Sequence, residues 1–106
     1  MQTGIQLEDI RTMQTYAIRR QNAFADQADL KQKAARSGEV LEKDLPDHVR
    51  WLRSYVVKEP DGRLGSICIY EATDVFAIRD HAHRAAIAAD EILPVLDTIV
   101  IRQDPA

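Results

Sequence analysis

The stretch WLRSYVVKEPDGRLGSICIYEATDVFAIRDHAHRA, residues 51–85, decides the fold of this chain. Residues 49–58 are rich in β-branched and aromatic side chains, which predicts a strand. The turn EPDGR follows, in which Pro60 presets φ and Gly62 adopts a positive φ at low cost. Residues 64–71 then predict the returning strand, so the segment is expected to form a β-hairpin.

Helices are expected on both sides of this hairpin. Residues 74–86 follow the helical period in their apolar positions and begin at an N-cap, either Thr73 or Asp74. Residues 25–43 predict an earlier helix with Asp26 as its N-cap. The hairpin is therefore expected to lie between two helices along the chain.

Two further strands are expected near the ends of the chain. The segment QTYAIRR, residues 14–20, alternates in polarity and suits a half-buried strand. Its Arg19 and Arg20 are expected near a sheet edge or at the strand end. After Pro94, the segment VLDTIVIR, residues 95–102, also alternates and predicts the final strand.

The order strand, helix, strand, strand, helix, strand is that of the ferredoxin-like βαββαβ sandwich. This α+β fold has a four-stranded antiparallel sheet with two helices on one face. We expect one such domain over 13–106, after a flexible N-terminal lead-in over 1–12. The sheet face without helices would expose Trp, Tyr and Ile side chains, which is a large apolar patch for a monomer. We therefore predict a homodimer, because closed two-fold dimers are the commonest oligomers.

Composition argues against several classes of function. The chain has 106 residues and a formal net charge of −3, so it lacks the broad basic surface of a nucleic-acid binder. No apolar run approaches the roughly 18 residues that cross a bilayer, and the first residues contain no apolar signal-peptide core. The single cysteine, Cys68, cannot form an internal disulfide. We expect a cytoplasmic protein that binds neither nucleic acid nor membrane.

The histidines and a nearby glutamate are candidate metal ligands, because imidazole binds nickel, copper and zinc and carboxylates can complete the shell. His81 and His83 point about 200° apart on a regular helix, so they cannot chelate one ion together. Glu71 precedes this helix and could reach an ion held by His81, although a salt bridge to an arginine is its favoured role. His48, in a loop, could join a site across a dimer. For each histidine, a structural or surface role is the commoner alternative.

An apolar pocket on the sheet is the alternative site. Trp51 and Tyr55 are expected to share one face of their strand, as pocket, core or interface residues. Tyr70 and Cys68 belong to the next strand, and Cys68 is expected to pack as a small hydrophobe rather than act as a thiolate. Four arginines could bind an anionic ligand but are expected at solvated strand positions: Arg19, Arg20, Arg50 and Arg53. The sequence contains no HExxH, paired CxxC, phosphate-loop or GxSxG motif, so no catalytic residue is assigned.

Four short segments of the second half of the chain match a known pattern in order and spacing: WLRSYV at 51–56, CIYEA at 68–72, DHAHRA at 80–85 and AADEI at 88–92. Here the chain resembles a family of small bacterial ferredoxin-like proteins of unknown function that includes a nickel-binding member. The resemblance implies a dimeric, cytoplasmic protein that binds a divalent transition metal, namely nickel or alternatively zinc or copper. In this chain the candidate ligands are His81 and Glu71, with His83 as an added one, because many members of the family have Arg-Arg where this chain has His83-Arg84. The chain departs from the family at Arg19, where an acidic residue is common.

Two interpretations of function therefore compete. The first is a metal-binding protein for buffering or sensing. The second is a small dimeric enzyme or ligand-binding module that acts on a small organic molecule in a pocket lined by Trp51, Tyr55, Cys68 and Tyr70. The second interpretation rests on analogy between folds. A concave pocket beside a histidine with a perturbed pKa would favour it.

Overall fold

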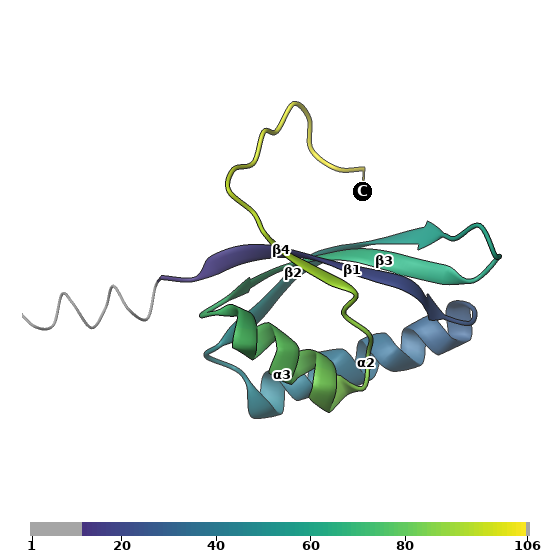
Figure 1. Cartoon of the computed structure of the whole chain (residues 1–106), viewed down its shortest axis with the longest axis horizontal. Coiled ribbons are helices and arrows are strands. Elements are labelled where there is room, and N and C mark those ends of the chain that lie inside the picture. The colour runs from purple at the N-terminus through teal and green to yellow at the C-terminus, as the bar shows by residue number, and fades with distance from the viewer. Residues whose placement is uncertain (1–11, 106) are drawn as a thin grey trace, which may run out of the picture.

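A computed structural model describes residues 12–105 of the chain (Figure 1). Six elements follow one another: β1 (Gln14–Phe24), α2 (Gln27–Asp44), β2 (Val49–Lys58), β3 (Leu64–Ala72), α3 (Val75–Ala85) and β4 (Glu91–Pro94). Their order confirms the predicted succession of strands and helices. The predicted lead-in lies, except for its last residue, outside the described residues. No helix within residues 12–105 is long and apolar enough to cross a membrane.

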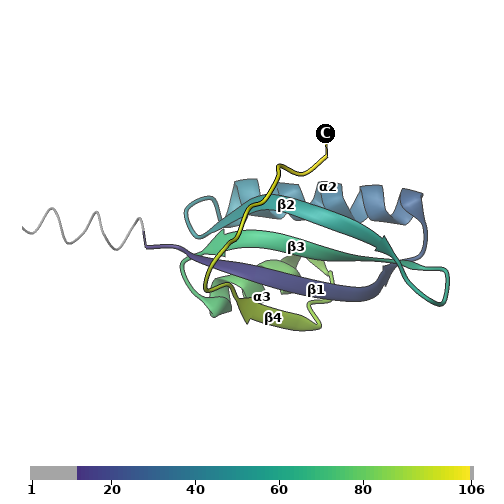
Figure 2. The same ribbon diagram turned by 90° about the horizontal axis from the view of Figure 1, so that it is seen from above.

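The four strands form one sheet in the order β2-β3-β1-β4, and every neighbouring pair is antiparallel. Both helices cover the same face of this sheet, as Figures 1 and 2 show. The arrangement confirms the predicted α+β ferredoxin-like fold. We call the sheet face under the helices the inner face and the opposite one the outer face.

The core lies between the inner face and the two helices. Successive residues of a strand face opposite sides of a sheet, so alternate positions enter the core. On β3 four inward positions are buried: Ser66, Cys68, Tyr70 and Ala72. The helices contribute Val40 and Leu41 from α2, and Ile78 and Ala85 from α3. All the buried residues of α2 lie in its second half. Space for a cavity therefore remains beneath its first half.

Both helices begin at an aspartate. The Asp26 carboxylate accepts a hydrogen bond from the backbone N–H of Asp29 at 2.9 Å, and Asp74 accepts one from Ala77 at 2.9 Å. Each bond satisfies an N–H group that has no partner inside the helix. The structure therefore confirms Asp26 as the first N-cap and selects Asp74 over Thr73 for the second.

Strand β1 is longer and more central than its sequence indicates. It continues to Phe24, past an irregularity in the pairing where Asn22 has a φ of 50°, and it lies between β3 and β4. The expectation that Arg19 and Arg20 lie near an edge or a strand end is therefore wrong. Arg20 continues the inward alternation of Ile18 and is buried, and its Nη1 donates to the carbonyl of Ala88 just after α3.

An extra residue in β2 separates two aromatic side chains that simple alternation places together. Trp51 pairs with Tyr70, whereas Arg53 pairs with the residue just before Tyr70, so Leu52 is left over. Trp51 faces inward and stacks on Tyr70, with 6.0 Å between ring centroids. Tyr55 faces outward. The prediction that Trp51 and Tyr55 share a strand face is therefore wrong, because one inserted residue reverses the alternation.

The last strand is β4, at Glu91–Pro94, and the prediction of a strand over 95–102 is wrong. β4 pairs with β1, and just beyond it the Val95 N–H donates to the carbonyl of Thr15 at 2.8 Å. Because β1 begins at Gln14, a strand over 95–102 would run past the end of its partner. The chain instead turns away from the sheet edge.

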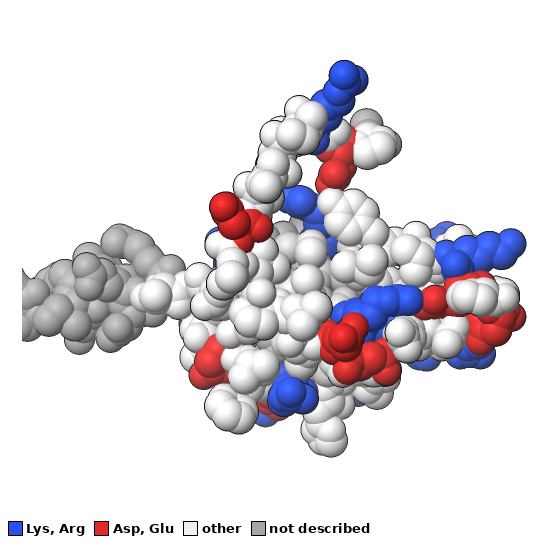
Figure 3. Space-filling model, turned by 45° about the horizontal axis from the view of Figure 1, so that its top comes forward, with Lys and Arg blue, Asp and Glu red and all other residues white. Residues whose placement is uncertain are grey.

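The outer face and the C-terminal segment (residues 95–105) expose many apolar side chains. They are Tyr55 on β2, Ile67 on β3, Leu93 on β4, and Leu96, Ile99, Val100 and Ile101 in the C-terminal segment. The hydroxyl of Tyr55 donates to the carboxylate of Asp104, which ties the end of this segment to β2. Figure 2 shows the segment passing over the strands, and Figure 3 shows a largely uncharged surface next to it.

Candidate ligand cavity and buried histidine

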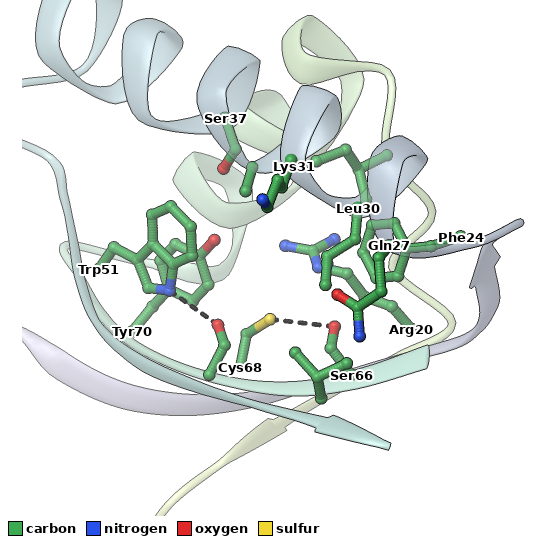
Figure 4. Close-up of a pocket in the computed structure, with 14 residues that line it drawn as sticks. Arg20, Phe24, Gln27, Leu30, Lys31, Ser37, Trp51, Ser66, Cys68 and Tyr70 are labelled. Atoms are coloured by element: carbon green, nitrogen blue, oxygen red, sulfur yellow. Dashed lines mark hydrogen bonds between the residues drawn. The ribbon is translucent and has the colours of Figure 1, made fainter. Parts of the chain in front are cut away.

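A cavity of about 290 Å³ opens between α2 and the inner face of the sheet (Figure 4). Three of the four predicted pocket residues line it: Trp51, Cys68 and Tyr70. Tyr55 does not line it, because that side chain lies on the outer face. The structure places these three side chains around a cavity on the helix side of the sheet, and a ligand pocket there stays a prediction.

Small side chains leave this space open. Inward positions of β2 and β3 hold Ser54, Ser66 and Cys68, and α2 contributes Ala34 above them. Larger aliphatic residues at these positions would fill the volume. Protein interiors normally contain few voids larger than a water molecule. A cavity of this size, bounded by aromatic and aliphatic side chains, has the form of a small-molecule site.

One cation lies in the cavity wall and is almost completely buried. Arg20 is 2% exposed, and its guanidinium points into the cavity (Figure 4). Its Nη1 donates to the carbonyl of Ala88, whereas its Nη2 is buried and has no hydrogen-bond partner among the described residues. The guanidinium carbon lies 6.0 Å from the centroid of the Tyr70 ring. Among residues 12–105, no carboxylate forms an ion pair with Arg20.

His81 lies behind the cavity wall and is 0% exposed. Its Nε2 is hydrogen-bonded to Oγ of Ser37, which lines the cavity, at 2.9 Å. Its ring centroid lies 5.4 Å from that of Tyr70. Burial, and next the positive charge of Arg20, lower the pKa of His81 from 6.5 to about 4. The imidazole is therefore neutral at pH 7, and its Nδ1 is buried without a partner.

These features have consequences for chemistry. A concave pocket now lies beside a histidine with a perturbed pKa, the combination that favours the small-molecule interpretation. Cys68 is buried, and its Sγ lies 3.3 Å from Oγ of Ser66. That packing confirms Cys68 as a small buried residue. A nucleophilic thiol would need a base in contact with it, whereas the hydrogen-bond partner of Cys68 among the described residues is the hydroxyl of Ser66.

The structure separates the predicted metal ligands. Glu71 occupies an outward position on β3 and accepts a hydrogen bond from Arg50 at 2.9 Å, which confirms its favoured salt bridge. His81 lies under the inner face, so the sheet lies between it and Glu71. His83 is exposed near the end of α3. The three residues do not meet within one chain, and metal binding by them stays a prediction.

His48 and Glu71, by contrast, belong to the same end of the sheet. The Thr73 N–H donates to the carbonyl of His48 at 3.0 Å, and Arg50, two residues after His48, pairs with Glu71 in the register of β2 and β3. His48 is exposed and Glu71 is partly so. An imidazole and a carboxylate thus reach solvent from neighbouring points of the backbone.

Two residues of this site escaped the sequence analysis. Arg20 was expected at a solvated position, which is wrong, although Arg50 and Arg53 are indeed exposed. The available signal was the alternation of Tyr16, Ile18 and Arg20 on one strand face. Ser37 gave no signal, because a serine within a helix usually faces solvent.

The fold and cavity define a small ferredoxin-like α+β domain with space for a ligand. The model of the family described as nickel responsive protein SCO4226-like matches residues 16–95. That match covers most of the chain, so the chain belongs to this family of nickel-responsive proteins. Comparisons with curated proteins and with solved structures gave no match. The resemblance to a nickel-related family is confirmed.

The side chains of one chain do not fit a complete nickel centre. Within residues 12–105, no three His, Cys, Asp or Glu side chains gather closely enough to hold a metal ion. His81 offers one suitable atom, because Nδ1 of a neutral imidazole is a good nickel ligand. The nearby charge of Arg20 opposes a cation there. A nickel site would therefore need donors beyond the described part of a single chain.

Proposed function

We propose that this protein is a nickel-binding homodimer that holds the ion between its two subunits. The family match over residues 16–95 carries the nickel part of the proposal. The lack of a three-donor group among the described residues of one chain supports the shared site. Two-fold symmetry turns two donors on one chain into four donors around one ion. In the cell, such a protein would buffer or sense nickel in the cytoplasm.

The outer face is the surface that the second copy would cover. Tyr55, Ile67 and Leu93 are each more than one-third exposed there, and the C-terminal segment adds further exposed apolar side chains beside them. Removing this apolar area from water would drive association. A two-fold axis brings the same patch of both copies together, so one apolar surface is sufficient to form the interface.

His48 and Glu71 are the ligands we propose. They supply an imidazole and a carboxylate from the same end of the sheet, and two copies would give two nitrogen and two oxygen donors. Glu71 pairs with Arg50, whose side chain is 64% exposed. An exposed ion pair contributes only about 0–1 kcal/mol, so exchanging it for a metal bond costs little. His81 and His83 stay alternative ligands.

The proposal is tested by calorimetric titration of tag-free, metal-stripped protein with Ni²⁺, with Zn²⁺ and Cu²⁺ for comparison. Light scattering gives the oligomeric state. We expect twice the chain mass of 12.0 kDa and one Ni²⁺ per dimer. His48→Gln and Glu71→Gln should each weaken binding about tenfold or more, which is about 1.4 kcal/mol. His83→Gln removes the exposed imidazole of the alternative ligand, and it should leave nickel affinity unchanged if His48 and Glu71 hold the ion.

The outcomes separate the alternatives. A strict monomer at micromolar concentration would contradict the shared site. Loss of nickel binding only in His81→Gln would assign the metal to the buried imidazole instead. Absence of binding for all three metals would contradict the nickel-binding proposal as a whole.

A further inference from the structure

We propose that the cavity between α2 and the sheet binds a small organic carboxylate, with Arg20 as its counter-ion and Trp51 and Leu30 against its apolar body. This site is separate from the proposed nickel site. The cavity opens on the inner face, whereas Glu71 projects from the outer face. The proposal therefore stands whether or not the protein binds nickel.

The buried positive charge of Arg20 indicates that the ligand of the cavity is an anion. A buried guanidinium without a carboxylate partner is costly, because its hydration is lost and little replaces it. The Nη2 of Arg20 is buried without an acceptor, and the guanidinium faces the cavity (Figure 4). A carboxylate oxygen placed there would accept a charge-assisted hydrogen bond, which is about twice as strong as one between neutral groups. Lys31, which also lines the cavity, adds positive charge.

A second donor lies at the same wall. Tyr70 lines the cavity within reach of the Arg20 charge, at 6.0 Å between guanidinium carbon and ring centroid. Burial raises the pKa of the Tyr70 phenol, so its hydroxyl keeps its proton and can donate to an anion at neutral pH. The neutral His81 behind it adds no positive charge to those of Arg20 and Lys31. Arg20 and Tyr70 thus offer two donors to one anionic group.

The apolar side chains of the cavity wall determine which kind of molecule the carboxylate belongs to. Trp51, Leu30, Val56 and Phe24 present aromatic and aliphatic surface to the cavity. A sugar or nucleotide would leave its hydroxyl groups without partners against this surface. The volume of about 290 Å³ accommodates roughly ten non-hydrogen atoms at roughly 30 Å³ each. These properties select a carboxylate on a short hydrocarbon body over a phosphorylated metabolite.

The test uses the full chain, with Trp51 as a fluorescent reporter because it is the only tryptophan and lines the cavity. The probes are octanoate and octanamide, which match in size and differ in charge. We expect octanoate to bind about tenfold more tightly than octanamide. Arg20→Met should abolish this preference. Ala34→Leu, which fills the cavity, should abolish octanoate binding and leave a folded protein.

Matched controls distinguish the cavity from the surface. Arg36→Met removes an exposed arginine of α2, and Phe76→Ala removes an exposed aromatic ring of α3. Both variants should leave octanoate affinity unchanged. Thermal unfolding confirms that each variant is folded. If Ala34→Leu does not fold, Cys68→Leu fills the same cavity from the side of the sheet. Nickel titration of Arg20→Met should equal that of the natural sequence.

The proposal is overturned by any of three results. One is the absence of binding of octanoate up to millimolar concentration. Another is equal affinity for octanoate and octanamide, which would remove the role of the Arg20 charge. The last is octanoate affinity that persists when the cavity is filled, which would place the ligand on the apolar outer surface.

Discussion

Protonation of His81 should destabilise the folded chain in mildly acidic solution. The pKa of this imidazole is about 4 in the folded protein and 6.5 when the chain is unfolded. As the pH falls, the unfolded state therefore takes up the proton first, and the equilibrium shifts toward it. The stabilisation is complete above pH 6.5 and is lost as the pH falls from 6.5 to 4.

The size of this effect follows from the two pKa values. The difference of about 2.5 pH units corresponds to about 3.5 kcal/mol, at about 1.4 kcal/mol per unit. At pH 4.5, before the folded imidazole is fully protonated, the loss should be about 2.5 kcal/mol. This is a large share of the roughly 5–15 kcal/mol by which domains are stable.

Urea unfolding at pH 7.5 and pH 4.5 measures this loss in the natural sequence and in His81→Gln. Glutamine keeps a hydrogen-bonding group near Ser37 but does not titrate. Carboxylates contribute to the pH dependence of both proteins alike, so the difference isolates the imidazole. We expect the natural sequence to lose about 2.5 kcal/mol more than the variant. His83→Gln, on the exposed side of the same helix, is the control.

Equal losses in the natural sequence and in His81→Gln would refute the reasoning. So would NMR titration of the folded protein with a His81 midpoint near the ordinary value of 6.5. Either result would mean that water or an acceptor reaches the imidazole in the folded state.

Three further perturbations test the fold, and a fourth tests the proposed dimer. Gly65→Ala should lower the free energy of unfolding by about 2 kcal/mol in urea, because the added Cβ would lie 2.6 Å from the backbone oxygen of Arg20. Gly38→Ala, in a helix with nothing within 4 Å, should instead raise it by about 0.5–1 kcal/mol. Asp74→Ala should cost about 1 kcal/mol in thermal unfolding, and Asp74→Asn should recover most of it. Truncation after residue 95 should shift the proposed dimer toward monomer in light scattering, because four exposed apolar side chains are removed.

Local patterns were sufficient for most of the fold. The hairpin of β2 and β3 was predictable because its turn residues and strand residues are adjacent in the chain. Asp26 was predictable as an N-cap for the same reason, since it bonds an N–H group only three residues away. The errors arose where pairing partners are distant. The extra residue at Leu52 and the end of β4 depend on how strands meet in the sheet.

The candidate site was less predictable than the fold. Trp51, Cys68 and Tyr70 could be assigned to a pocket, because aromatic and small residues on neighbouring strands suggest one. The position of that pocket could not be predicted, because the irregularity at Leu52 decides which face of the sheet Trp51 lies on. The importance of Arg20 was hidden, because a strand arginine looks the same in sequence whether it is solvated or buried.

The sequence by itself determined the order of elements, the ferredoxin-like class and the link to a nickel-related family, because these depend on periodicity, turns and short motifs. Tertiary structure alone decided which chemical groups meet. It placed Glu71 and His81 on opposite sides of the sheet and made His81 neutral. It also placed Arg20 in a cavity wall where no carboxylate of the described residues pairs with it. Burial and charge pairing arise only when distant segments pack together, so no local pattern can specify them.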